Sequence, residues 1–243
     1  MDYKREVMNL SNRMRLISLD KNSIYVQAKY GPSKIVSLPT TINEELSCFV
    51  ALIIGDGHLN KNKFNTSIEC SNKELLDTLS EIIFDLFKIN VKISKVKKEE
   101  GKKQTWQLTI YSKAVQELLS RVFQVPRGKK SSIVRIPTNI ISNNNPIKSA
   151  FIVGLLAAEG SRKGAYRVRI CSASNSLLLD SQKILENLGI SSSIESWINK
   201  TYKREYYSLS FKRAHLDSLM RGCRSGQTGQ ILSIFKKAIG DQA

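Results

Sequence analysis

The sequence is poor in the residues that build disulfide scaffolds and zinc sites, and it has no long apolar run. Its 243 residues include only four cysteines and two histidines, and no two cysteines form a Cys-x-x-Cys pair. This scatter excludes a disulfide framework and disfavours a structural zinc site. Apolar runs such as residues 49–54 fall far short of the roughly 18 residues that cross a bilayer. The N-terminus also lacks a signal peptide, so we expect an intracellular protein in a reducing compartment, cytoplasmic or organellar, without membrane contact.

Acidic residues are scarce relative to basic ones. Lys and Arg total 38 against 21 Asp and Glu, which gives a formal net charge of +17. A positive excess of this size indicates a polyanionic partner. A highly soluble surface or a ribosome-associated protein would also carry such a charge, so charge alone does not identify an enzyme. Hydrophobic residues make up 41% of the chain, which predicts a folded globular protein.

An internal repeat organises the chain, with an offset of about 100 residues. The apolar segments 44–57 and 147–160 align and place Asp56 opposite Glu159. After each come a polar segment, an amphipathic helix, two strands and a further helix. The strands alternate apolar and polar residues, as in an antiparallel sheet covered on one face. We predict three parts: an N-terminal extension over 1–30, a first repeat over 31–125, and a linker, second repeat and C-terminal helix over 126–243.

The two repeated helices have recognisable starting signals. Thr41 and Glu44 have the spacing of a capping box, and Asn145 precedes a proline in the manner of an N-cap residue. A short strand-like run closed by Pro-Thr precedes each helix, at residues 34–42 and 132–140. The sequence therefore predicts a strand followed by a capped helix in both repeats.

Each of these helices carries small residues four positions apart. A helical glycine costs about 1 kcal/mol relative to alanine, and close packing of two helices gives a reason for it. If the helices run side by side in the same direction, Asp56 and Glu159 emerge together at their C-terminal ends. The small residues are Ser47, Ala51 and Gly55 on the first helix and Ala150, Gly154 and Ala158 on the second.

Two carboxylates at the negative ends of two helix dipoles need a compensating cation. Mg²⁺, or another divalent cation such as Mn²⁺, suits carboxylate, carbonyl and water oxygens. A single acid-glycine pair is an ordinary helix stop. Two such pairs at matched positions, Asp56-Gly57 and Glu159-Gly160, favour a shared metal site.

The segments FVALIIGDG (49–57) and IVGLLAAEG (152–160) resemble the two motifs of single-chain LAGLIDADG homing endonucleases. The resemblance extends over residues 31–221. It implies an α+β fold of two pseudo-symmetric αββαββα halves, packed through a central two-helix interface, with antiparallel sheets that form a DNA-binding saddle. It also implies a monomeric, metal-dependent hydrolase that cuts one phosphodiester on each strand of a long double-stranded DNA site and leaves short 3′ overhangs.

The same resemblance assigns roles to the motif residues. Asp56 and Glu159 are the expected catalytic metal ligands, and the carbonyls of Gly55 and Ala158 are expected to complete the metal shell. The residues expected to contact DNA, most of them assigned to the presumed DNA face of the strands, are Lys61, Lys63, Thr105, Gln107, Arg162, Lys163, Arg167, Arg169, Tyr206 and Ser208.

One part of the family pattern is missing. Where relatives often have glutamine or asparagine followed by lysine at a strand end, this sequence has Cys70-Ser71 and Ser172-Ala173. We therefore expect Lys73, Arg162 and Lys163 to supply the basic auxiliary groups of catalysis, or else to contact phosphate.

Two other functions stay open on the sequence. An RNA maturase that helps an intron RNA to splice would share the fold and the basic surface, and a non-cleaving DNA-binding regulator would retain the fold without the reaction. The intact Asp56 and Glu159 favour the nuclease. Because the chain starts at Met1 without a splicing nucleophile and ends Asp-Gln-Ala, we expect a free-standing, intron-encoded enzyme rather than an intein.

Overall fold

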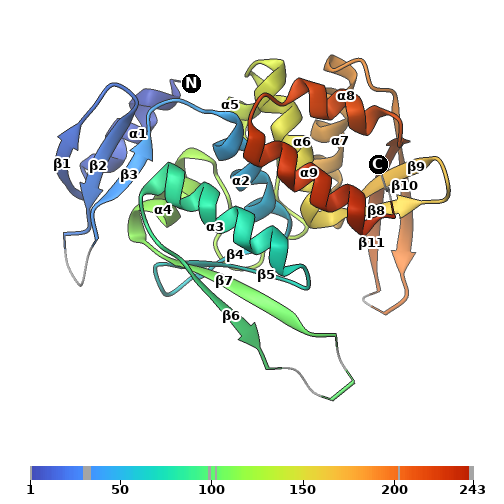
Figure 1. The fold of residues 1–243 in the computed structure, drawn as a ribbon, viewed down its shortest axis with the longest axis horizontal. Coiled ribbons are helices and arrows are strands. Elements are labelled where there is room, and N and C mark those ends of the chain that lie inside the picture. Colours follow the sequence, from blue (N-terminus) through green and yellow to red (C-terminus); the bar gives the residue numbers. More distant parts are fainter. Residues whose placement is uncertain (1, 30–33, 98–99, 102, 202, 241–243) are drawn as a thin grey trace.

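The computed structural model describes residues 2–29, 34–97, 100–101, 103–201 and 203–240. Two halves repeat the order αββαββα, which confirms the predicted α+β architecture (Figure 1). The first half comprises α2 (Glu44–Gly55), β4 (Gly57–Leu59), β5 (Asn65–Cys70), α3 (Lys73–Phe87), β6 (Lys92–Val96), β7 (Thr105–Tyr111) and α4 (Lys113–Glu117), which continues as the π-helix η1 (Leu118–Val122). The second comprises α6 (Asn145–Glu159), β8 (Gly160–Lys163), β9 (Arg167–Ser172), α7 (Asn175–Asn187), β10 (Ser192–Asn199), β11 (Arg204–Lys212) and α8 (His215–Gly222), followed by α9 (Gly226–Ala238).

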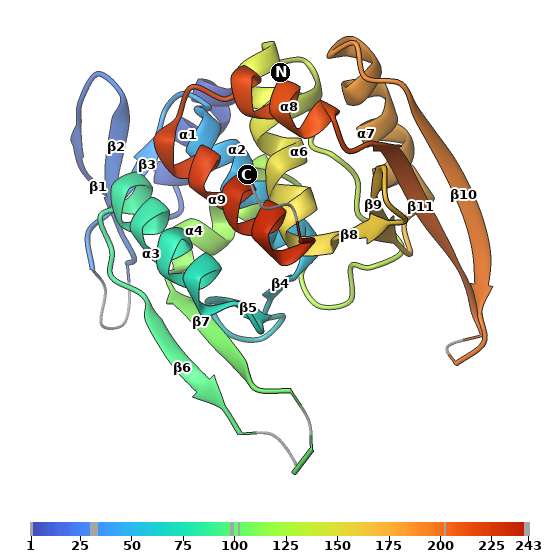
Figure 2. The same ribbon diagram turned by 45° about the vertical axis from the view of Figure 1, so that its right-hand side comes forward.

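Each half contains one antiparallel sheet of four strands, in the orders β4-β5-β7-β6 and β8-β9-β11-β10. The apolar face of the predicted alternation is confirmed, because Leu108 and Ile110 on β7 and Leu209 and Phe211 on β11 are buried. The polar residues next to them are buried as well, at Thr109, Ser208 and Ser210. Helix α3 packs against β7, and helix α7 packs against β10 and β11. Figure 2 shows the β6–β7 and β10–β11 hairpins reaching outward as two arms from the central helices. One face of each sheet is therefore covered, and we call the opposite one the uncovered face.

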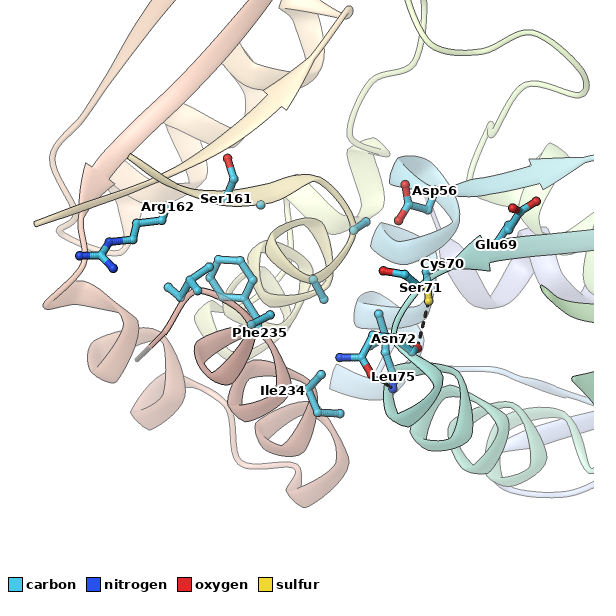
Figure 3. A pocket seen from close by; sticks show the side chains of 15 residues that line it. Asp56, Glu69, Cys70, Ser71, Asn72, Leu75, Ser161, Arg162, Ile234 and Phe235 are labelled. Carbon is cyan, nitrogen blue, oxygen red and sulfur yellow. Dashed lines mark hydrogen bonds between the residues drawn. The ribbon is translucent and has the colours of Figure 1, made fainter. Parts of the chain in front are cut away.

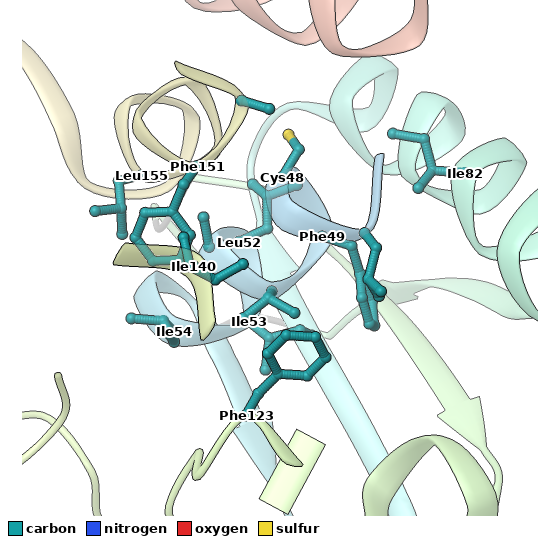
Figure 4. Packing of buried hydrophobic residues seen from close by; sticks show 14 of the residues in the cluster. Cys48, Phe49, Leu52, Ile53, Ile54, Ile82, Phe123, Ile140, Phe151 and Leu155 are labelled. Atoms are coloured by element: carbon teal, nitrogen blue, oxygen red, sulfur yellow. The ribbon is translucent and has the colours of Figure 1, made fainter. Parts of the chain in front are cut away.

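Helices α2 and α6 pack against each other at the centre of the molecule, with residues 46–54 and 149–156 buried (Figure 4). A Cβ atom added at Gly154 would lie 2.5 Å from the carbonyl oxygen of Cys48 and 2.7 Å from Cβ of Ala51. Nearer the start of both helices, the Ser47 hydroxyl donates to the carbonyl of Ile147 at 2.8 Å. The predicted packing of small residues between two helices that run in the same direction is confirmed.

The structure corrects the predicted start of both helices. The N-cap of α2 is Asn43, whose side chain accepts the N–H of Leu46 at 2.9 Å, and not Thr41. The N-cap of α6 is Asn144, one residue before the predicted Asn145. An Asn side chain directly before the first turn reaches these N–H groups with the same geometry that a capping Ser or Thr would use.

The two Pro-Thr runs also differ from each other. In the first, β3 (Val36–Pro39) is a strand because β2 (Ser23–Gln27) pairs with it. In the second, residues 134–137 have no strand assignment and lead into the short helix α5 (Thr138–Ile141). There the Val134 carbonyl accepts the Ser174 hydroxyl at 2.6 Å instead of a neighbouring strand. The prediction of a second strand was wrong, because local sequence does not provide the strand partner.

The N-terminal region adds a helix, α1 (Tyr3–Ser11), and a three-stranded antiparallel sheet in which β1 (Arg15–Leu19) and β2 (Ser23–Gln27) join β3. The Tyr3 hydroxyl donates to the Pro39 carbonyl at 3.1 Å, and its ring lies 5.8 Å from that of Phe123. This sheet spans the predicted boundary between residues 30 and 31, whereas the functional assignment of residues 1–30 stays open. The four cysteines are free thiols, and none of the described helices is long and apolar enough to span a bilayer.

Candidate active site

The two acids lie at the C-terminal ends of the central helices. Asp56 is the C-cap residue of α2, and Glu159 is the last residue of α6. A Cβ atom added at Gly55 would lie 2.5 Å from Cβ of Ala158 and 3.1 Å from Cγ of Glu159, so only glycine allows this approach. The motif ends are therefore in contact, and the helices bring their two carboxylates to one region.

A lysine from the connection between the halves lies at the same place. Lys130 is only 9% exposed, and its ammonium group donates to the carbonyl of Gly55 at 2.7 Å and to the carbonyl of Ile54. These carbonyls belong to the last turn of α2, where the helix dipole is negative. Lys130 thus supplies the positive charge that this end of the helix pair requires.

The connection is anchored on both sides of Lys130. Gly128 adopts a φ of +79°, a conformation that favours glycine, and its N–H donates to the Leu59 carbonyl at 2.8 Å. Further along, Arg135 forms an ion pair with Asp180 of α7 at 3.0 Å. Because one end is fixed to the first half and the other to the second, Lys130 is positioned between them.

The three charges shift one another's pKa values. Desolvation and the neighbouring Glu159 raise the pKa of Asp56 to about 7, and Lys130 opposes this shift. Desolvation likewise raises the pKa of Glu159, again opposed by Lys130, and lowers the pKa of Lys130 to about 8. Asp56 is nevertheless exposed along one side, where water screens its charge. Groups of opposite charge whose pKa values shift one another at one place are typical of catalytic sites.

Each carboxylate opens into its own cleft. The Asp56 cleft has a volume of about 620 Å³ and is bounded by the end of β5, by Ala158 and by α9 (Figure 3). The Glu159 cleft is smaller, about 230 Å³, and is bounded by Gly55, Lys130 and the end of β9. The strand ends Cys70-Ser71 and Ser172-Ala173 lie in the first and second cleft respectively. Each cleft thus pairs the acid of one motif with the backbone of the other.

The donor set fits a hard divalent cation. Among the described residues, no cluster of three or more His, Cys, Asp or Glu side chains could hold a metal ion by itself. Mg²⁺ does not need such a cluster, because it is commonly held by one or two carboxylates together with waters and substrate phosphates. Asp56 lies with Ala158 in one cleft, and Glu159 lies with Gly55 in the other, where the Gly55 carbonyl accepts the Lys130 ammonium.

The three basic residues expected to assist catalysis have other partners. Lys73 forms an ion pair with Asp77 at 2.8 Å, and Lys163 forms one with Glu195 at 2.6 Å. Arg162 lines the Asp56 cleft but points away from Asp56 (Figure 3), and its Nε donates to the carbonyl of Gly164 at 2.8 Å. Lys130 was missed by sequence reasoning because it is one of several basic residues in an irregular segment, and only the fold brings it to the acids.

Most of the residues expected to contact DNA share the uncovered sheet faces. Thr105 and Gln107 lie there on β7, Arg167 and Arg169 on β9, and Tyr206 on β11. Ser208 also belongs to this face of β11 but is only 2% exposed, so the structure does not present it for contact with DNA. Lys163 pairs with Arg167 across β8 and β9 and lies on the same face. Arg162 is paired with the buried Val168 and so belongs to the covered face. Lys61 and Lys63 are exposed in the loop between β4 and β5.

Comparison with known proteins places this geometry in a family. The model of the LAGLIDADG-like domain family matches residues 43–124 and 146–222, one segment in each half. The chain belongs to the LAGLIDADG-like domain family. Each matched segment contains one of the two central helices and the four-stranded sheet that follows it.

Two curated relatives of this LAGLIDADG-like chain are archaeal proteins. The chain is 29% identical over 189 residues to a subunit of the A-type ATP synthase of Pyrococcus abyssi, and the match covers 76% of this chain and 17% of that protein. It is 26% identical over 178 residues to the replication factor C small subunit of Methanocaldococcus jannaschii, and this match covers 73% of this chain and 9% of that protein. The chain thus spans less than a fifth of the length of these relatives.

Solved structures confirm the LAGLIDADG fold. I-DmoI in complex with DNA and Ca superposes with a TM-score of 0.54 at 21% identity, over 79% of this chain and 97% of that chain. I-DmoI with DNA and Mn gives a TM-score of 0.53 at 22% identity, over 75% and 98%. The homing endonuclease I-WcaI bound to its DNA recognition sequence gives 0.53 at 12% identity, over 79% and 87%.

Proposed function

We propose that this chain is a site-specific, divalent-metal-dependent DNA endonuclease that acts as a monomer. It hydrolyses one phosphodiester on each strand of a long duplex site and leaves short 3′ overhangs. The observation that carries the proposal is the pair of carboxylates, Asp56 and Glu159, at the joined ends of two helices between two uncovered sheet faces. The metal- and DNA-bound structures of I-DmoI, which share this fold, support it.

The clefts divide the metal-binding oxygens between them. Asp56 and the Ala158 carbonyl would hold one divalent cation, and Glu159, with the Gly55 carbonyl that Lys130 also contacts, would hold another or share the first. A bound Mg²⁺ or Mn²⁺ supplies activation of water and neutralisation of the charge on the leaving 3′ oxygen. The carboxylates would position the cation, and Gly55 allows the ends of both motifs to lie close to it.

Lys130 takes the basic auxiliary role that the sequence had given to Lys73, Arg162 and Lys163. Its ammonium group, already beside the Gly55 carbonyl, faces the Glu159 cleft and would contact a phosphate oxygen drawn into it. Lys73, Arg162 and Lys163 are then phosphate contacts or surface charges, each with a partner of its own in the free protein.

The test is cleavage of a randomised duplex library with Mg²⁺, followed by capture and sequencing of new ends. We expect paired cuts with short 3′ overhangs at one recurrent sequence, absent in chelator and absent for Asp56→Asn and Glu159→Gln. Tight binding of DNA or RNA without cleavage under any divalent cation would contradict the proposal and favour the regulator or RNA maturase function.

A further inference from the structure

The uncovered faces of the two sheets differ strongly in charge. Side chains that are paired across strands share a face, so the registers define each set. On the β4–β7 sheet the charged members are one cation, Lys92, and one acid, Glu69. On the β8–β11 sheet they are five cations, Lys163, Arg167, Arg169, Arg204 and Lys212, and one acid, Glu195. Segments 97–104 and 200–203 carry equal net charge in the sequence. The loop between β4 and β5 adds Lys61 and Lys63, whereas the loop between β8 and β9 adds no charge, so the excess on the second sheet lies in its strands.

The arginines of the second sheet are held in place by neighbouring hydroxyl groups. Arg167 donates to the Ser193 hydroxyl at 3.0 Å and to the Ser210 carbonyl at 2.9 Å. Arg169 donates through Nε to the Ser161 hydroxyl at 3.0 Å. A planar guanidinium fixed in this way loses little freedom when it binds, and its fork matches the O6 and N7 acceptors of guanine.

The first sheet has a different set of reading groups. Gln107 is suited to adenine, whereas Glu69, which accepts the Thr105 hydroxyl at 2.7 Å, is suited to the amino group of cytosine. Lys92 is the one cation on the uncovered face of its described strands, so the strands themselves attract phosphate weakly, and phosphate attraction comes mainly from Lys61 and Lys63 in the β4–β5 loop. Its sequence preference therefore depends on hydroxyl, amide and carboxylate groups.

We propose that the two halves of the DNA site are read unequally. The β8–β11 sheet contributes most of the affinity and of its salt dependence, and Arg167 and Arg169 bind guanines in its half-site. The β4–β7 sheet reads a half-site with fewer guanines and contributes less to affinity and to its salt dependence. This inference rests on the proposed function for the identity of the ligand, duplex DNA, but not on cleavage.

Binding selection from randomised duplex DNA, with Ca²⁺ and without cleavage, tests the inference. Arg167→Lys and Arg169→Lys keep the positive charge but remove the pair of guanidinium donors that binds guanine. Gln107→Ala identifies the half-site that the β4–β7 sheet contacts. Arg221→Lys on α8, whose guanidinium donates to the Ser218 hydroxyl at 3.3 Å, is the matched control and should leave the selected sequence unchanged. Each substitution on a sheet should relax the selected sequence only where that side chain contacts it.

The expected result is a cluster of guanines on the side that responds to Arg167→Lys and Arg169→Lys. Replacing one of them by 7-deazaguanine, which lacks the N7 acceptor, should weaken wild-type binding by about 5- to 150-fold. For the lysine variant of the arginine that contacts that guanine, the same base change should lower the binding affinity little or not at all. Guanines spread evenly over both halves, uniform weakening of all sequences by the lysine variants, or no enriched sequence at all would overturn the inference.

Failure here is distinguishable from failure of the endonuclease. If the selected site is cut with Mg²⁺ by the wild type but not by Asp56→Asn, and its guanines are evenly spread, the nuclease stands and the unequal reading is wrong. If the guanines cluster as expected but no divalent cation supports cleavage, the unequal reading stands and the nuclease is wrong.

Discussion

The Asp56 and Glu159 clefts occupy equivalent places in the two repeats, but different residues line them. The Glu159 cleft receives Lys130, which comes from the chain that follows η1 and leads to the second half. The equivalent chain after α8 leads instead to α9, whose Ile234 and Phe235 line the Asp56 cleft (Figure 3). A duplicated fold on one chain has only one connection between its halves. The asymmetry of the site therefore follows from topology and not only from substitutions within the motifs.

The largest effect should come from removing either acid. Asp56→Asn and Glu159→Gln should each slow cleavage of both strands by about a thousandfold or more. The reason is that the two carboxylates lie in one region, and each cleft is also lined by residues of the other motif. Binding to target DNA in Ca²⁺ should persist, since the sheet faces are unchanged. Gel-shift titrations and single-turnover cleavage measure the two quantities separately. A variant that cuts one strand at the wild-type rate would show that the clefts act independently.

The packing that joins the clefts is tested by a larger side chain between the helices. Gly154→Val places atoms against the Cys48 carbonyl, 2.5 Å from the position of Cβ, and should lower the free energy of unfolding by about 2–4 kcal/mol. Gly229→Ala on α9 is the control, because nothing lies within 4 Å of its added Cβ. It should be neutral or stabilise by up to about 1 kcal/mol. Equal urea midpoints for the two variants would contradict the close helix contact.

The smallest effect is the pH dependence of the metal-free protein. The folded state raises the pKa of Asp56 from 3.8 to about 7, so it prefers the protonated acid and loses stability as pH rises through that range. It lowers the pKa of Lys130 from 10.5 to about 8, so it prefers the neutral amine and regains stability as pH rises from 8 towards 10.5. Solvent at the open side of Asp56 keeps the slope on the acid side shallow.

Thermal unfolding in chelator between about pH 4 and 10 should therefore pass through a shallow minimum near pH 7 to 8. Asp56→Asn should reduce the slope on the acid side, where Glu159 also contributes, and Lys130→Met should reduce the slope on the alkaline side. Added Mg²⁺ should raise the wild-type melting temperature more than that of Asp56→Asn. A flat profile for the metal-free wild type would mean that neither group is strained by the fold.

Features that occur in both repeats could be predicted from the sequence, whereas features that occur once could not. The helix stripes, the sheet alternation and the convergence of Asp56 and Glu159 could all be read from matched positions in two copies. Lys130 has no matched copy and no local pattern, because its position depends on contacts such as that of Gly128 with Leu59, far apart in sequence. The failed strand at 132–140 has the same cause, since a strand requires a partner that local sequence does not specify.

Strand-resolved cleavage of a supercoiled plasmid that carries the selected site is the most direct test of this account. Wild type should linearise the plasmid, and Asp56→Asn and Glu159→Gln should leave it intact. Lys130→Met, which removes a charge from the Glu159 cleft alone, should slow one specific strand by about 10- to 100-fold and accumulate plasmid nicked on the other. Linearisation by Lys130→Met without a nicked intermediate, or by either acid variant, would contradict a two-carboxylate site with unequal clefts.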